Sequence, residues 1–168
     1  PLIAAVSDGM GGHAAGEVAS RLSVEALDTW TRELCDAPQN VLVDAFFNAN
    51  AQVLRASDED PRLRGMGATL VAAFFFHDHL ITANIGDSRL YLVSGGEIRQ
   101  VTFDHSYVQE LVRRGYLTEE EAKSHPNRNV ITRCIGSDTA FDPDVFYTRW
   151  NPKDTAILCS DGLCGVLT

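Results

Sequence analysis

Two Asp-Gly pairs, each placed directly after a short apolar run, constrain the fold of this chain more than any other feature. Residues 2–6 lead into Asp8-Gly9, and residues 156–159 lead into Asp161-Gly162. A short apolar run bounded by glycine is typical of a buried strand, which would hold the aspartate at the rim of the core. Two such carboxylates that meet in space would form a site for a hard cation, because hard cations prefer oxygen ligands.

A single Asp-Gly pair is more often only a turn. The first pair, however, belongs to the cluster Asp8-Gly9-Met10-Gly11-Gly12-His13, which has three glycines in four residues. A turn does not require so many. Glycine allows the backbone to approach another group closely, so the cluster favours a binding site over a simple turn.

Composition limits the possible functions. The chain has 168 residues, 45% hydrophobic, which suits one globular domain with its own core. Its formal net charge of -9 argues against general binding to nucleic acid or to an anionic membrane surface. No apolar stretch approaches the roughly 20 residues that a membrane helix needs. The four cysteines form no Cys-x-x-Cys pair, so we expect reduced thiols in a cytoplasmic domain.

The periodicity of apolar residues predicts an α+β fold. Helical spacing extends from Gly16 to Leu34, and a second helix begins at the N-cap residue Asn40. Four strands with short turns then follow and predict an antiparallel meander, at residues 68–76, 80–85, 89–93 and 97–101. The later elements are a short helix, a helix opened by a capping box, an extended stretch and a last strand, at residues 107–114, 118–125, 129–135 and 154–160.

Five stretches stand in a characteristic order: residues 8–13 with Gly16-Glu17, residues 65–70, residues 83–89, residues 102–106 and residues 158–163. Together they resemble the motifs of the metal-dependent protein phosphatases of type 2C, above all the bacterial branch. The resemblance implies a sandwich of two antiparallel sheets flanked by helices. It implies that residues 1–168 form a single phosphatase-like domain segment that lacks the family's N-terminal and C-terminal strands.

The resemblance also implies a metal site. By similarity, two Mg²⁺ or Mn²⁺ ions lie at one end of the sandwich with a water between them. Asp8 would bridge the ions, the Gly9 carbonyl would help to bind one, and Asp161 would hold the other. Asp104 resembles the ligand of a third, weaker ion in bacterial members. Residues 115–147 resemble the flap beside the substrate entrance.

The implied activity is hydrolysis of phosphoserine and phosphothreonine in proteins by a metal-activated water, in signalling that opposes a protein kinase. Asp8 and Asp161 would be the catalytic carboxylates. An alternative is a truncated or inactive phosphatase-like domain that binds phosphoproteins or partners. Another is a different enzyme on the same fold, acting on a small phosphoester or on a phosphorylated anti-sigma-factor antagonist. A receiver-like or dehalogenase-like domain would instead need strands alternating with helices, which the four adjacent strands disfavour.

The match to the family has gaps. An Arg and an acidic ligand that precede the first Asp-Gly in the family, and an Asp-Asn motif that follows the second, fall outside this sequence. We therefore expect this segment alone to bind metal weakly and to turn over slowly or not at all. Met10 stands where animal members carry a proposed general acid, and His13 is expected to support the glycine loop rather than donate a proton.

Several other polar residues have structural interpretations. We expect Asp87 to accept hydrogen bonds from backbone amides or from Arg89 in a tight bend. Thr69 is expected to support the sheet below the metals. His105 would either orient Asp104 or lie on the surface. Two further residues flank Asp161 and are expected only to pack: Cys159 and Cys164.

Overall fold

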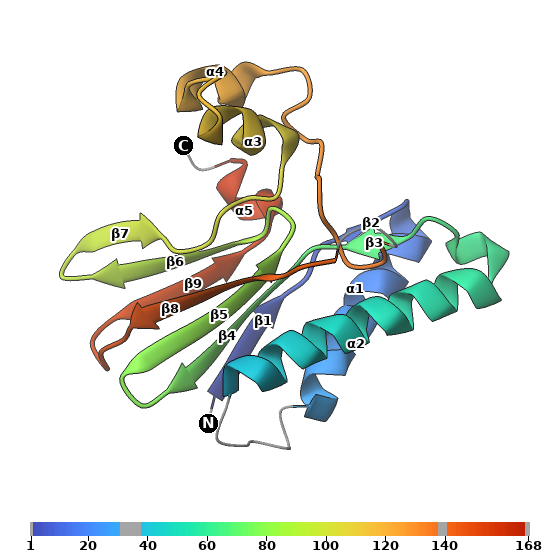
Figure 1. The fold of residues 1–168 in the computed structure, drawn as a ribbon, viewed down its shortest axis with the longest axis horizontal. Coiled ribbons are helices and arrows are strands. Elements are labelled where there is room, and N and C mark those ends of the chain that lie inside the picture. Colours follow the sequence, from blue (N-terminus) through green and yellow to red (C-terminus); the bar gives the residue numbers. More distant parts are fainter. Residues whose placement is uncertain (1, 31–37, 138–140, 167–168) are drawn as a thin grey trace.

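The computed structural model describes residues 2–30, 38–137 and 141–166, and over these residues it confirms the predicted α+β fold. Two antiparallel sheets form adjacent layers (Figure 1). The first sheet has the order β1 (Leu2–Val6), β4 (Leu70–Phe76), β5 (His79–Ile85) and β8 (Asp144–Arg149). The second has the order β7 (Glu97–Gln100), β6 (Arg89–Ser94) and β9 (Thr155–Cys159). A small ladder joins β2 (Gly9–Met10) to β3 (Gly67–Ala68).

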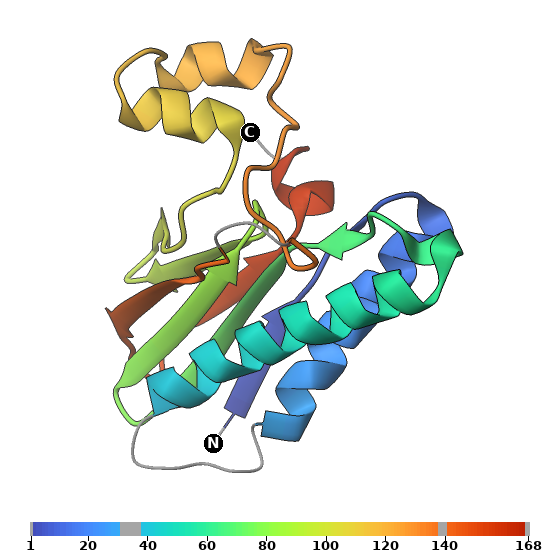
Figure 2. The same ribbon diagram turned by 45° about the vertical axis from the view of Figure 1, so that its right-hand side comes forward.

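Two long helices cover the outer face of the first sheet. They are α1 (His13–Trp30) and α2 (Pro38–Glu59), and a short 3-10 helix, Pro61–Leu63, follows them (Figure 2). Each helix begins two or three residues before the predicted start, and the predicted end of the first helix at Leu34 lies outside the described residues. Neither helix is long and apolar enough to cross a membrane, nor is any other helix in the described part of the chain.

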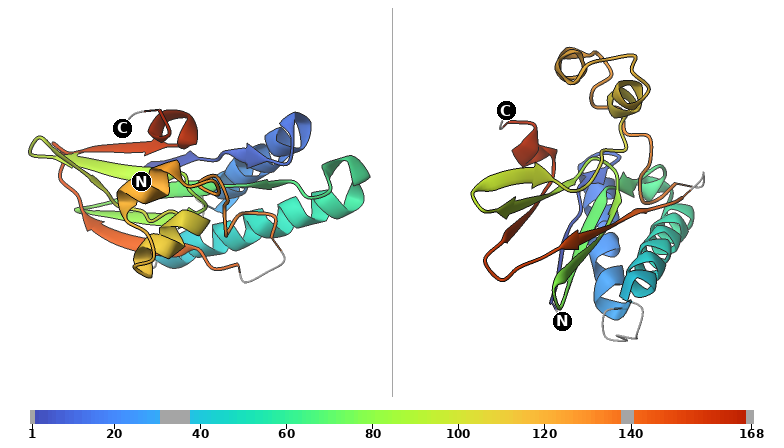
Figure 3. Two further views of the ribbon diagram at one scale, coloured as in Figure 1. Left: turned by 90° about the horizontal axis from the view of Figure 1, so that it is seen from above. Right: turned by 60° about the vertical axis from the view of Figure 1, so that its left-hand side comes forward.

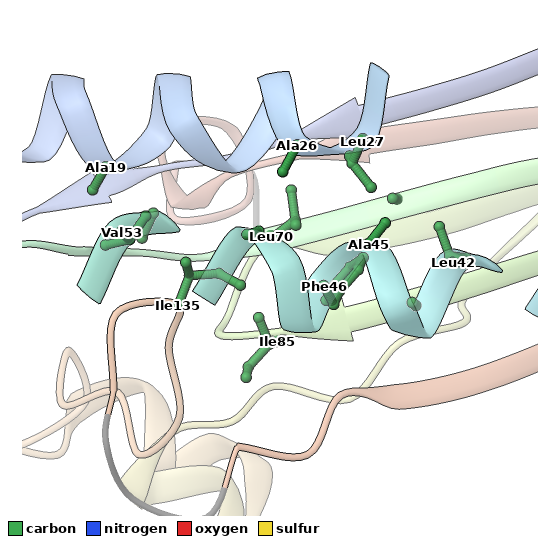
Figure 4. Packing of buried hydrophobic residues seen from close by; sticks show 14 of the residues in the cluster. Ala19, Ala26, Leu27, Leu42, Ala45, Phe46, Val53, Leu70, Ile85 and Ile135 are labelled. Atoms are coloured by element: carbon green, nitrogen blue, oxygen red, sulfur yellow. The ribbon is translucent and has the colours of Figure 1, made fainter. Parts of the chain in front are cut away.

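The core has two parts because the first sheet is buried on both faces. Helix-facing residues such as Leu70 and Ile85 pack with Phe46 and Val53 of α2 (Figure 4). Strand β4 alternates, so its residues Val71 and Ala73 instead face the second sheet. This double burial explains why residues 70–76 are all apolar. In the part of the chain that the structure describes, both long helices lie on the same side of the sandwich (Figure 3).

The predicted strands exist, but the predicted meander is wrong. Strands β4 and β5 form one hairpin and β6 and β7 another, whereas β5 and β6 lie in different sheets. The chain changes sheet at residues 86–88. Gly86 has φ +101°, and a Cβ atom there would lie 2.6 Å from the Thr69 side chain, so the bend requires glycine. The antiparallel pairing also rules out the parallel receiver-like or dehalogenase-like alternative for the described residues.

The segment between β7 and β8 leaves the sandwich and carries two short helices, α3 (Tyr107–Arg113) and α4 (Glu119–Ser124). The predicted capping box between Thr118 and Glu121 is confirmed. Residues 129–135 make only isolated bridges, at Ile131 and Ile135, rather than an extended strand. The predicted flap boundary at residue 147 is wrong, because β8 begins at Asp144 and pairs with β5 inside the first sheet.

Candidate metal centre

The two aspartates that follow the apolar runs meet at one end of the sandwich. Asp8 follows β1 of the first sheet, and Asp161 opens α5 (Asp161–Cys164) directly after β9 of the second. Their carboxyl groups lie within hydrogen-bonding reach of each other. Burial raises the pKa of Asp8, and the negative charge of Asp161 raises it further, against weaker opposing hydrogen bonds from Ser160 and Gly9.

A set of buried hydroxyl groups fixes the backbone at Asp8. The Asp8 N–H donates to Thr69 Oγ1 at 3.0 Å, and the Thr69 N–H donates to the Asp8 carbonyl at 2.8 Å. Thr69 Oγ1 also lies 2.6 Å from Ser88 Oγ, and Ser7 Oγ donates to the Thr69 carbonyl at 2.6 Å. Thr69 therefore joins the end of β1 to the beginning of β4, which agrees with its predicted role in supporting the sheet.

The glycines of the first cluster serve the backbone itself. A Cβ atom on Gly9 would lie 2.0 Å from the carbonyl oxygen of Gly16, and one on Gly16 would lie 2.8 Å from the carbonyl carbon of Gly9. Gly11 and Gly12 have φ +108° and +88°, which side chains disfavour. The close approach expected of this cluster is thus an approach to α1. The side chain of His13 lies outside the described part of the structure.

Asp104 has a different environment. Arg89 donates to both of its carboxylate oxygens, with Nη2 2.6 Å from Oδ2 and Nε 2.9 Å from Oδ1, and Gln100 Nε2 donates to Oδ1 at 3.1 Å. A buried carboxylate is well stabilised by such a bidentate arginine. Of the two partners expected for Asp87, Arg89 is wrong, since it pairs with Asp104, whereas a backbone amide does bond to the Asp87 carboxylate. The metal role of Asp104 stays a prediction.

Asp87, which the sequence indicates only as a structural residue, lies near enough to Asp104 and Asp161 to interact with their charges. It is half-buried at the bend between the sheets, and its pKa is raised to about 6 by burial and by the charges of Asp104 and Asp161. The signal for it was available, since Gly86-Asp87 follows the apolar strand β5. In Gly86-Asp87 the glycine precedes the aspartate, whereas in the two Asp-Gly pairs it follows the aspartate.

His105 is neither a surface residue nor a partner of Asp104, so both expectations for it are wrong. Its side chain is almost fully buried, and its ring contacts the N–H of Gly86 and the carboxylate of Asp144. Burial lowers the pKa of His105, and the adjacent Asp144 only partly offsets that effect.

The predicted reduced state of the cysteines holds where the structure describes them. Cys134, Cys159 and Cys164 are free thiols, and Cys35 lies outside the described residues. Cys159 is buried, and Cys164 Sγ lies 3.3 Å from the Ser160 carbonyl oxygen. Burial raises the pKa of the Cys164 thiol to about 11, which leaves it protonated and suits a packing role.

The donor set at Asp8 and Asp161 fits a hard divalent cation that keeps part of its water shell. Among the described residues, no Lys or Arg forms an ion pair with either carboxylate. Nor does any group of three His, Cys, Asp or Glu side chains in the described ranges converge enough to hold a metal without water. Mg²⁺ usually keeps several waters and is bound by one or two carboxylates, so the two facing carboxylates suit such an ion.

Comparison with known proteins identifies the class to which this fold and this carboxylate pair belong. The profile described as "Protein phosphatase 2C" matches residues 1–167. The serine/threonine phosphatase stp of Listeria monocytogenes is 40% identical over 170 residues, which cover 98% of this chain and 68% of that protein. The chain therefore belongs to the protein phosphatase 2C family.

Solved structures agree with this assignment. The crystal structure of the serine/threonine phosphatase PstP/Ppp of Mycobacterium tuberculosis has a TM-score of 0.89 and 41% identity, covering 96% of this chain and 68% of that one. The catalytic domain of PstP in complex with two manganese ions has a TM-score of 0.85 and 38% identity, covering 96% and 67% of the two chains. The predicted two-sheet phosphatase sandwich is confirmed by these likenesses.

Proposed function

We propose that this chain hydrolyses phosphoserine and phosphothreonine in proteins in a reaction that depends on Mn²⁺ or Mg²⁺. The observation that carries the proposal is the facing pair Asp8 and Asp161, which has no protein cation between its carboxylates in the described structure. The names of the relatives, as serine/threonine phosphatases, support the substrate class.

Each residue at the site has a definite task in this proposal. Asp8 would bind two ions through its carboxylate, the Gly9 carbonyl would contribute to one of them, and Asp161 would bind the other. When bound, such a pair of cations lowers the pKa of a coordinated water and neutralises charge on the phosphoryl oxygens. Two hydrogen bonds join Thr69 to the Asp8 backbone, and we call this pair of bonds the clasp. The clasp holds the Asp8 carboxylate in place at the rim of the sheet.

The proposed reaction is a single displacement at phosphorus. A water oxygen forms a bond to phosphorus while the bond from phosphorus to the serine or threonine oxygen breaks. One proton of that water stays with the phosphate, and the other goes, overall, to the leaving oxygen. The products are inorganic phosphate and the free hydroxyl side chain. Cysteine takes no part, since Cys159 and Cys164 are occupied in packing beside Asp161.

We also propose Asp104 as the ligand of a third, weaker ion. Its two oxygens now accept hydrogen bonds from Arg89 and Gln100, so an ion would have to displace part of the Arg89 contact. That competition supports weak binding at this position. A protein kinase that makes the substrates, and a cytoplasmic location in which both act, belong to the same proposal.

Because slow turnover is expected of this segment, the test is phosphate release from a phosphothreonine peptide at high protein concentration and increasing Mn²⁺ concentration. Asp8→Ala and Asp161→Ala should each lower kcat/KM by about a hundredfold or more, because even outer-shell partners of metal ligands contribute about 10- to 100-fold. The matched control is Asp58→Ala, an exposed aspartate on α2, which should retain activity. Release that needs no divalent cation, or that survives both site substitutions, would contradict the proposal. A wild-type chain that binds phosphopeptide without hydrolysing it would favour the binding module instead.

A further inference from the structure

The two limbs of the segment that carries α3 and α4 are joined at its base. We call residues 106–132 the excursion. The Tyr107 N–H donates to the Val130 carbonyl at 2.8 Å, and the Thr132 N–H donates to the His105 carbonyl at 2.8 Å. The His105 N–H donates in turn to the Gly86 carbonyl at 2.9 Å. The excursion is therefore closed into a loop whose base is attached to the bend between β5 and β6.

The ring of His105 lies at the centre of this junction. It is 2% exposed, and Nδ1 accepts the Gly86 N–H at 3.1 Å. Because a backbone N–H can only donate, the ring proton of the neutral imidazole must be on Nε2. Nε2 lies 3.1 Å from Asp144 Oδ2, so it donates to that carboxylate at the start of β8.

Arg133 completes the junction from the outgoing limb. Its Nη1 lies 3.4 Å from His105 Nε2, but two donors cannot form a hydrogen bond with each other. Arg133 Nη1 therefore donates to Asp144 Oδ1 at 3.2 Å and to the Asp142 carbonyl at 3.3 Å. One carboxylate thus receives the ring of the incoming limb and the guanidinium of the outgoing limb.

The two hydrogen bonds of the His105 ring indicate a role beyond filling space in the core. A phenyl group would fill the same space without the cost of burying polar atoms, and an imidazole avoids that cost only when both nitrogens have partners. Both nitrogens of His105 do have partners, and these lie on two separate parts of the chain, Gly86 and Asp144. Figure 1 shows the excursion and α5, whose first residue is Asp161, at the same end of the sandwich.

We propose that His105 is a positioning residue that fastens the base of the excursion to the first sheet, at the end of the sandwich that carries the candidate metal centre. The fastening itself stands on the contacts above. Its effect on a peptide substrate rests on the proposed function: a peptide bound at the metal centre would extend toward neighbouring segments, whereas a small phosphoester would not.

Three substitutions separate the two ring contacts. His105→Asn keeps an acceptor near the position of Nδ1, His105→Gln keeps a donor near the position of Nε2, and His105→Phe keeps only the volume. The matched control is His125→Asn. The ring of His125 also accepts a backbone N–H at Nδ1, from Asn127 at 3.1 Å, and its centroid lies 5.9 Å from that of the Tyr107 ring, but no hydrogen bond or ion pair joins it to Gly86 or Asp144 in the described structure.

Amide hydrogen exchange of the 168-residue chain tests the fastening without metal or substrate. In His105→Phe the amides of Gly86, Tyr107 and Thr132 should exchange about tenfold faster or more, whereas His125→Asn should leave those of Gly86 and Thr132 unchanged. His105→Asn should protect Gly86 better than His105→Gln does. Equal protection of Tyr107 and Thr132 in the wild type and in all three variants would overturn the proposal. If His105→Phe does not fold, the Asn and Gln variants give the same comparison.

Kinetics test the link to the substrate. In His105→Phe the KM for a phosphothreonine peptide should rise about tenfold, while kcat/KM for p-nitrophenyl phosphate should change less than about twofold. An equal loss with both substrates would overturn the positioning role. A wild-type chain that hydrolyses neither substrate would refute the proposed function, and the exchange experiment would still decide whether His105 fastens the excursion.

Discussion

Replacing Thr69 by valine should weaken the end of the sandwich that carries Asp8, whereas the same replacement at Thr82 should not. Both threonines are buried. Thr82 lies in β5, and Thr69 directly precedes the neighbouring strand β4. The Thr69 hydroxyl bonds to the Asp8 N–H and to Ser88 Oγ. The Thr82 hydroxyl has no hydrogen-bond partner within the described structure. The pair therefore compares a satisfied hydroxyl with an unsatisfied one at nearly constant volume.

The magnitudes follow from these contacts. Thr69→Val loses two hydrogen bonds, each contributing about 0.5–1.5 kcal/mol, so the free energy of unfolding should fall by about 1–3 kcal/mol. Thr82→Val removes a buried hydroxyl that gains nothing in the folded state, so the free energy of unfolding should rise by about 1 kcal/mol. For a chain of this size each kcal/mol shifts the melting temperature by roughly 2–4 °C, so the two variants should melt several degrees apart.

Thermal and urea unfolding measured without metal give both free energies directly. Mn²⁺ binding to the same proteins then reports whether the clasp matters for the site, and Thr69→Val should bind more weakly than Thr82→Val. If the two variants have the same unfolding free energy and the same Mn²⁺ affinity, the hydrogen bonds of Thr69 do not hold Asp8 in place.

Two further substitutions test other parts of the site. Asp87 has a pKa of about 6 in the folded chain against an ordinary value of 3.8. The folded state therefore binds more protons between these values, and stability falls as pH rises through about 6. In metal-free buffer, Asp87→Asn should raise the free energy of unfolding by about 2 kcal/mol at pH 7 and by much less near pH 4, and a pH-independent effect would refute this reasoning. Gly16→Ala should lower the free energy of unfolding by about 1–3 kcal/mol, because its new methyl group would lie 2.8 Å from the Gly9 backbone. The control Gly162→Ala, whose methyl group meets nothing nearer than 3.5 Å, should unfold at a higher urea concentration than Gly16→Ala.

The sequence was most informative where structure is local. The capping box at Thr118 depends only on neighbouring residues, strands β4, β5 and β6 each show their own apolar pattern, and the turn at Gly95-Gly96 indicates β7, so these predictions are confirmed. The order of the sheets was less accessible. Strand β6 pairs with β9, more than sixty residues later, and nothing in the pattern of β5 and β6 indicates that the chain changes sheet between them.

The site shows the same limit. The meeting of Asp8 and Asp161 could be expected because both follow buried strands, and the structure brings them together. The pairing of Asp104 with Arg89 could not be expected in the same way. Asp87 is nearer to Arg89 in sequence, and Arg89 is brought to Asp104 only by the fold. His105 was misjudged for a similar reason. Its partner Asp144 begins β8, a strand with no long apolar run, and the flap predicted over residues 115–147 includes the first part of that strand.

The most direct test of the account is a crystal structure of this chain grown with Mn²⁺, with anomalous scattering measured at the manganese absorption edge. The account predicts anomalous density between the carboxylates of Asp8 and Asp161, and its loss in Asp8→Ala crystals grown in the same way. Density that persists in Asp8→Ala, or that lies only at carboxylates remote from this pair, would contradict the claim that these two aspartates form the metal centre.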